Sequence, residues 1–211
     1  MVLSAVTANP SLTRSANGEP PGTGWRYAVH FHQPGPGVLP SPALLERQAS
    51  HTMPFLPRNF VVPARIDTER FLMRSITIHD VFKDYDAVMS SREHLWNRFG
   101  KIWGWPTEDM TIEHNIVDLG WHQKEFKLRS SFDYALMTPD ESRLLGCVYI
   151  DPPSEEGTDA EVWFWARSSE VPKGLEIFLG AFLPQWLSTA WPFAIVSING
   201  LRYTLERAGE A

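Results

Sequence analysis

The sequence is poor in cysteine, since Cys147 is the single cysteine among 211 residues. One thiol excludes an intramolecular disulfide framework and every zinc or iron–sulfur site built from several cysteines. No run approaches 18 consecutive apolar residues, so we expect no membrane-spanning segment. The first residues also lack a charged stretch followed by an apolar one, so we expect no signal peptide and a cytoplasmic location.

An excess of positive charge is also absent. The formal net charge is −6, which argues against a protein that coats nucleic acid or an anionic membrane. Hydrophobic residues make up 43% of the chain and charged residues 21%, as is typical of a globular protein. The nine tryptophans are the one compositional feature that these bounds leave unexplained.

Proline is concentrated before residue 64. Ten of the seventeen prolines lie within residues 1–63, and such a segment cannot sustain a long helix or a central strand. We predict a disordered tail over residues 1–23, because that segment has little apolar surface to bury. Residues 24–63 are predicted to be a proline-rich extension that packs on the domain, which itself spans residues 64–211.

From residue 65 onward the hydrophobic pattern becomes regular. It predicts strands over 69–76, 131–137, 144–150, 159–166, 193–198 and 201–206, and helices over 77–99, 112–126 and 175–187. Asn199-Gly200 is a strong signal for a two-residue hairpin turn, and Pro184 should kink the third helix or end it early. This order predicts an α/β (α+β) fold, with a mixed, mostly antiparallel sheet flanked by helices and one parallel crossover.

Several side chains are predicted to be structural. Trp96, Trp121 and Trp186 fall in predicted helices and are assigned to the core. Cys147 sits inside a continuous apolar run, so we expect a buried and inert thiol.

No metal site is expected from the histidine spacing. His114 and His122 on the second helix would be about 12 Å apart along its axis, too far to share an ion. Either could act as a base, although polar residues of an amphipathic helix are the simpler interpretation. His30 and His32 have no carboxylate at a recognisable spacing.

Three stretches resemble the acyl-CoA N-acyltransferase superfamily, known as the GNAT fold. They are residues 66–80, residues 144–150, and the strand 161–166 followed by a loop, Gly174 and a helix. These look like the family's opening strand and helix start, its central strand, and its strand, pyrophosphate loop and helix that bind coenzyme A. The resemblance covers roughly residues 64–200. It implies direct transfer of an acyl group from acetyl-CoA or another acyl-CoA to a small amine.

The resemblance also implies roles for single residues. Glu161 on the fourth strand of the fold would be the catalytic base that deprotonates the amine. The residues implied to bind the cofactor are Phe164, Trp165, Arg167, Lys173, Gly174 and Leu175. Those implied to bind the acceptor are Trp103, Trp105, Glu113 and Trp163. Together with Trp165, three of these indoles would converge on a pocket for an apolar or aromatic acceptor.

Each of these assignments has a structural alternative. Glu161 could be a solvent-facing strand carboxylate, and the four indoles could simply pack together or form a dimer surface. The family's loop usually reads R/Q-x-x-G-x-G/A, whereas Ser169 and Pro172 stand at its first two defined positions and only Gly174 matches. The alternative function is therefore a catalytically silent GNAT-like domain that binds a ligand or forms a homodimer.

Overall fold

The computed structural model describes residues 55–206. The predicted disordered tail, most of the proline-rich extension, and residues 207–211 lie outside the described residues. The chain forms β1 (Arg65–Asp67), β2 (Leu72–Ser75), η1 (Ile78–Asp80), α2 (Val81–Ser90), α3 (Arg92–Trp103), α4 (Ile112–Leu128), β3 (Phe132–Met137), β4 (Leu144–Asp151), β5 (Ala160–Ala166), α5 (Leu175–Ala190), β6 (Ile195–Ile198) and β7 (Leu201–Thr204).

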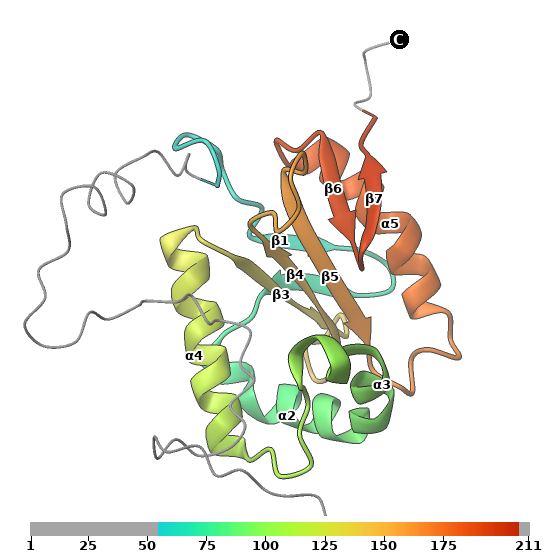
Figure 1. Cartoon of the computed structure of the whole chain (residues 1–211). Coiled ribbons are helices and arrows are strands. Elements are labelled where there is room, and N and C mark those ends of the chain that lie inside the picture. The colour runs from blue at the N-terminus through green and yellow to red at the C-terminus, as the bar shows by residue number, and fades with distance from the viewer. Residues whose placement is uncertain (1–54, 207–211) are drawn as a thin grey trace, which may run out of the picture.

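The seven strands form one sheet in the order β1-β2-β3-β4-β5-β6-β7 (Figure 1). Every neighbouring pair is antiparallel except β5 and β6, which are parallel and are joined through α5. The predicted mixed sheet and its parallel crossover are therefore confirmed. The predicted hairpin is also confirmed, because Asn199 and Gly200 both adopt positive φ angles, 50° and 79°, in the turn between β6 and β7.

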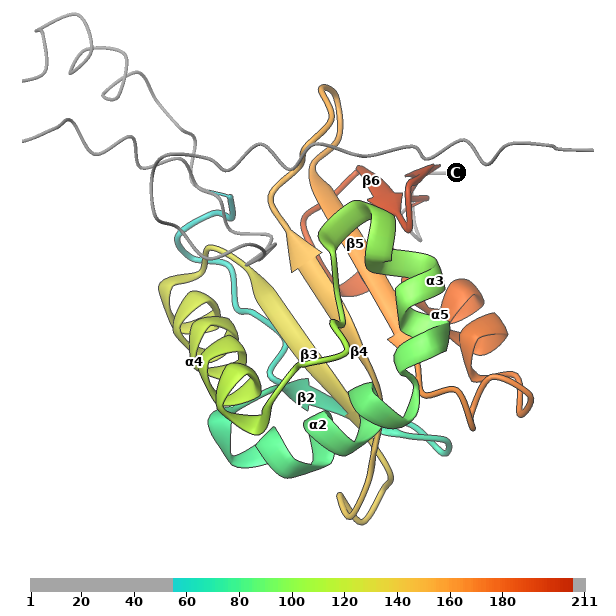
Figure 2. The ribbon, with the colours of Figure 1, turned by 60° about the horizontal axis from the view of Figure 1, so that its bottom comes forward.

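Helices cover both faces of the sheet. Helices α2, α3 and α4 lie on one face and α5 on the other (Figure 2). Alternation along β5 divides its side chains between the two hydrophobic layers: Trp163 and Trp165 pack toward α3, and Val162 and Phe164 pack toward α5. This confirms the alternation predicted for the strand. The face of β5 toward α3 therefore carries two tryptophans, and the face toward α5 carries a valine and a phenylalanine.

Three features of the structure differ from the predicted elements. The first helix breaks at Ser91, whose buried hydroxyl accepts a hydrogen bond from the Ser168 N–H at 2.9 Å. The short strand β1 was not predicted, because three exposed or half-buried residues carry little periodicity. Of the two effects predicted for Pro184, the early end is wrong, because α5 continues to Ala190. The carbonyl that loses its partner belongs to Gly180, which lies on the exposed side of the helix, where water can bind it.

Two of the tryptophans assigned to the core are exposed. Trp96 is 43% exposed and Trp121 is 48% exposed, whereas Trp186 is buried as predicted. On α3 the buried stripe is formed by Leu95, Phe99 and Trp103, four residues apart, so Trp96 lies one position outside it. A shift of one residue along the helix is enough to expose the side chain. The position of a tryptophan within a helix therefore does not by itself predict that it is buried.

Cys147 lies in the middle of the sheet and is 1% exposed, as predicted. Burial raises the pKa of its thiol well above the ordinary value. A protonated, inaccessible thiol is a poor nucleophile, so the structure supports the expected inert role.

Residues 55–63 lie against the sheet layer that faces α5. Leu56 is buried there, and the ring of Phe60 lies 5.5 Å from that of Trp191. The Tyr134 hydroxyl donates a hydrogen bond to the carbonyl of Pro63 at 2.7 Å. Within residues 55–206, no helix has the length and apolar character needed to cross a membrane.

Candidate functional site

The candidate site lies where β5 and β6 separate. Their parallel pairing runs from Ala160, opposite Val196, to Val162, opposite Ile198. It stops there because β6 turns into β7 at Asn199, whose N–H still donates to the carbonyl of Val162 at 2.8 Å. The second half of β5 therefore leaves the β6 ladder, and its edge faces the start of α5.

Two backbone N–H groups along this edge point to side-chain oxygens from other elements. The N–H of Phe164 donates to Oδ1 of Asn199 at 3.1 Å. The N–H of Ala166 makes a longer contact of 3.4 Å with Oε1 of Glu176, from the first turn of α5. Neither Asn199 nor Glu176 was among the predicted site residues. Their approach to β5 depends on the turn and on the crossover helix, which no local sequence pattern reveals.

Glu176 is also the centre of an ionic cluster between α3 and α5. His94 places Nε2 at 3.2 Å and Arg98 places Nη1 at 2.9 Å from its carboxylate. The Arg98 guanidinium lies 5.3 Å above the ring of Phe164, within cation–π distance. The predicted cofactor residue Phe164 thus sits beneath a cation supplied by α3.

The loop from β5 to α5 holds three of the six predicted cofactor residues, whereas Phe164 and Trp165 lie on β5 and Leu175 begins α5. Gly174 adopts a left-handed conformation, with φ of 77°, at the N-cap of α5. Arg167 is buried and paired with Asp86 of α2. Lys173 is exposed and pairs with Glu170 at 3.0 Å.

The same loop contains a buried carboxylate, and cations from other parts of the chain contact the loop. Burial alone would raise the pKa of Glu170, but Lys173 and Arg143 outweigh it and keep the pKa below the ordinary value. Arg143 lies 2.9 Å from that carboxylate, and Arg70 donates to the carbonyl of Lys173 at 2.9 Å. Arg70 comes from the β1–β2 connection, so only the folded sheet brings it to this loop.

The four predicted indoles do come together. Trp103 lies 5.2 Å from Trp163 in an edge-on arrangement, and Trp105 lies 6.2 Å from Trp165. Trp103 also stacks on Phe99 at 4.2 Å. All but Trp105 are about nine-tenths buried or more. The cluster is a packed layer between α3 and the sheet, and Trp105 is its half-exposed member.

The two predicted carboxylates occupy different places. Glu161 is half-buried on β5, with Asp151 opposite it on β4 and Ser197 opposite it on β6. Glu113 is exposed at the start of α4, where its own N–H and the side chain of Thr111 lower the pKa of its carboxyl. The structure thus places Glu161 on the strand that lines the opening, and Glu113 in the first turn of α4, whose N-cap is Thr111.

A buried polar network lies beneath α2 and α4. Asp84 is 5% exposed, and burial raises its pKa to about 7. Nδ1 of His122 is 2.8 Å from Asp133, and its Nε2 is 3.5 Å from Asp118. Burial alone would lower the pKa of His122, but the two carboxylates outweigh it and hold that pKa well above its ordinary value. This network was not predicted.

No protein-family model matches the chain, and no curated protein matches its sequence. Solved structures do match its fold. RimL, a ribosomal L7/L12 alpha-N-protein acetyltransferase solved in complex with coenzyme A, superposes with a TM-score of 0.52 at 12% identity, over 64% of this chain and 73% of that one. The microcin C7 self-immunity acetyltransferase MccE, in complex with acetyl-CoA and AMP, gives 0.50 at 10% identity, over 62% and 69%. The chain therefore has the fold of the GNAT acetyltransferases.

Proposed function

We propose that the chain is an acyl-CoA-dependent N-acyltransferase that transfers an acetyl group directly to a small amine. The observation that carries the proposal is the end of the β5–β6 pairing at Val162 and Ile198. It leaves a strand edge with amide donors beside the N-terminus of a helix, which suits an extended acyl thioester with a phosphate at one end. RimL and MccE, solved with coenzyme A and acetyl-CoA, share this fold.

The residues around α5 fit a pyrophosphate. Gly174 begins the helix in a left-handed conformation, and a helix N-terminus favours anions. Three cationic side chains contact or belong to the same loop: Arg70, Arg143 and Lys173. Together they carry three positive charges, against the one negative charge of the buried Glu170 carboxylate. Positive side chains thus stand where the family's glycine-rich loop would use backbone amides.

Glu161 is proposed to remove the proton from the acceptor. An amine is protonated at neutral pH and has no lone pair until a base accepts that proton. Glu161 is half-buried at the end of β5 that pairs with β6, and it shares a strand face with Trp163. The half-exposed Trp105 offers an apolar contact for the acceptor.

Replacing Glu161 with Gln should lower turnover by about 100-fold while changing acetyl-CoA affinity by less than about threefold. The amide keeps the side-chain shape but cannot accept the proton. Steady-state kinetics with a panel of amines, together with calorimetry for the cofactor, would measure both effects. Glu156→Gln, in the exposed loop between β4 and β5, is the matched control and should leave both values unchanged. Turnover of Glu161→Gln equal to wild type would remove Glu161 from the mechanism.

A specific observation favours the second candidate, a catalytically silent ligand-binding domain. Asn199 and Glu176 already accept the Phe164 and Ala166 amides, so a thioester could use that edge only after these side chains move. A calorimetric titration with acetyl-CoA and with CoA separates the two candidates. Absence of binding at millimolar concentrations would overturn the enzyme proposal and leave the silent domain.

Removing the Asn199 side chain provides a second test. Asn199→Gly should tighten acetyl-CoA binding by about threefold to tenfold, because the Phe164 amide is released for the ligand. Glycine tolerates the φ of 50° at this turn, so the hairpin should keep its form. Calorimetry measures the affinity, and a thermal melt verifies the fold. Unchanged affinity in a folded variant would show that the ligand does not use this amide.

A further inference from the structure

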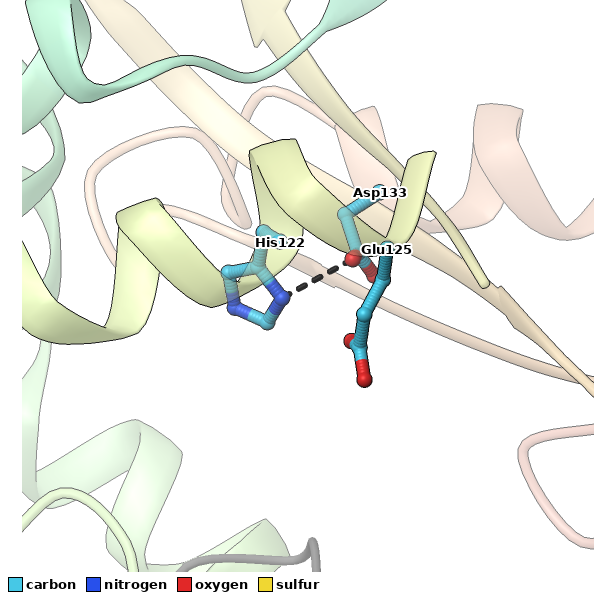
Figure 3. A group of neighbouring side chains, drawn as sticks. All are labelled: His122, Glu125 and Asp133. Atoms are coloured by element: carbon cyan, nitrogen blue, oxygen red, sulfur yellow. Dashed lines mark ion pairs between the residues drawn. The ribbon is translucent and has the colours of Figure 1, made fainter. Parts of the chain in front are cut away.

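Three potential metal ligands meet between α4 and β3. His122 and Glu125 lie three residues apart on α4 and so share one face of the helix, and Asp133 approaches from β3. Nδ1 of His122 and one carboxylate oxygen of each acid all lie within 4.8 Å of one another. Figure 3 shows the three side chains turned toward one common space.

Asp133 is the most deeply buried of the three, at 1% exposure. Neither of its carboxylate oxygens accepts a hydrogen bond from the part of the chain that the structure describes. A buried carboxylate ordinarily receives several hydrogen bonds, because water no longer solvates it. Nδ1 of His122 lies 2.8 Å from Oδ2 and forms an ion pair with it, outside hydrogen-bond geometry. A divalent cation that replaced the proton on Nδ1 would have both of these atoms as ligands.

A second carboxylate faces the other ring nitrogen of His122, Nε2. Asp118, one turn earlier on α4, places Oδ2 3.5 Å from Nε2. A carboxylate on that side fixes the orientation of the ring and keeps a proton on Nε2, so Nδ1 is the nitrogen that faces Asp133 and Glu125. Metal-bound histidines are commonly oriented in this way by a second carboxylate.

The donor set selects the class of ion. One imidazole nitrogen and two carboxylate oxygens suit zinc, whereas calcium and magnesium prefer oxygen alone. The two carboxylates balance the charge of a divalent cation. Glu125 is half-buried, and rotation about its side-chain bonds would bring its oxygen to about 2.0–2.2 Å from the ion.

We propose that His122, Glu125 and Asp133 bind one zinc ion, which joins α4 to β3 within the buried polar network. The site does not depend on the proposed acyl transfer. Three protein ligands leave a fourth position for water. Binding displaces the proton from Nδ1 of His122 into solvent, as is usual when a metal ion replaces a proton on a histidine ligand.

The test uses the full chain, with any affinity tag removed and traces of metal stripped by a chelator. Titration with zinc chloride should show one equivalent bound and a raised melting temperature. Glu125→Ala should weaken zinc binding at least about tenfold, and Glu113→Ala, on the first turn of the same helix, should not. The absence of stoichiometric zinc binding by the wild type would overturn the proposal. Equal binding by Glu125→Ala would do so as well, because the zinc would then lie elsewhere.

Nuclear magnetic resonance of the wild-type protein tests the same site without any substitution. Histidine side-chain nitrogen spectra should show one ring whose Nδ1 signal shifts on addition of one equivalent of zinc, with saturation at that ratio. Magnesium chloride should leave the same signal unmoved. A zinc-induced shift at Nε2 alone, or gradual shifts spread over several rings, would contradict a site at Nδ1 of His122.

Discussion

Gly146→Ala should destabilise the fold by about 3–5 kcal/mol, one of the two largest effects we expect from a single substitution. Gly146 lies on β4 opposite Ala166, in the centre of the sheet. A Cβ added there would stand 2.1 Å from the carbonyl oxygen of Trp165 and 3.0 Å from the Cα of Ala166. Both obstacles are backbone atoms, so no rotation of a side chain can make room. The strands must separate, which breaks ladder hydrogen bonds on β5.

The matched control is Gly180→Ala on α5. That position is exposed, with nothing within 4 Å of an added Cβ, and alanine is a better helix former than glycine. It should stabilise the protein by about 0.5–1 kcal/mol. Urea unfolding followed by circular dichroism measures both variants. A loss below about 1 kcal/mol for Gly146→Ala would mean that β4 and β5 are not packed as closely as described.

The elements of the fold could be predicted because their signals are local. The alternation over residues 159–166 fixed both the strand and the faces of its side chains, and Asn199-Gly200 fixed the final hairpin. The predicted element bounds were wrong where contacts between distant residues determine the end of a helix. The break at Ser91 depends on a hydrogen bond to Ser168, which is 77 residues away.

The candidate site was predicted less completely than the fold. Glu161, Phe164 and the indoles follow from strand position and from the resemblance to a known fold. Asn199, Glu176 and Arg98 do not, because their contacts with β5 join a turn, a crossover helix and α3. Periodicity assigns a residue to a face, but it does not say which distant side chain reaches an open strand edge.

The proposed zinc site was missed for the same reason. Comparison of histidine pairs gave no metal site, although His122-x-x-Glu125 is a spacing that puts two ligands on one helical face. The third candidate ligand, Asp133, follows the turn after α4 and faces back toward it. An apolar strand with one acidic residue was the available signal. It has value only once the helix is known to pack on that strand.

Asp84→Asn should stabilise the protein at high pH and have little effect at low pH. Asp84 lies on α2 and is 5% exposed, with Sγ of Cys147 3.8 Å from its carboxylate. Burial raises the pKa of Asp84 from an ordinary value of 3.8 to about 7 in the folded protein. The unfolded chain therefore loses this proton first as pH rises, and it binds fewer protons than the folded chain between about pH 4 and pH 7.

The direction of the effect follows from that difference. Stability falls as pH rises through this window, and the full cost of about 4 kcal/mol applies above pH 7, where the folded state must bury an ionised carboxylate. Asparagine has nearly the same shape and no charge, so Asp84→Asn should gain about 2–4 kcal/mol at pH 8 and about zero at pH 4. Urea unfolding at both pH values measures the gain, with the exposed Asp109→Asn as control. A gain independent of pH would show that Asp84 ionises in the folded protein as readily as in the unfolded chain.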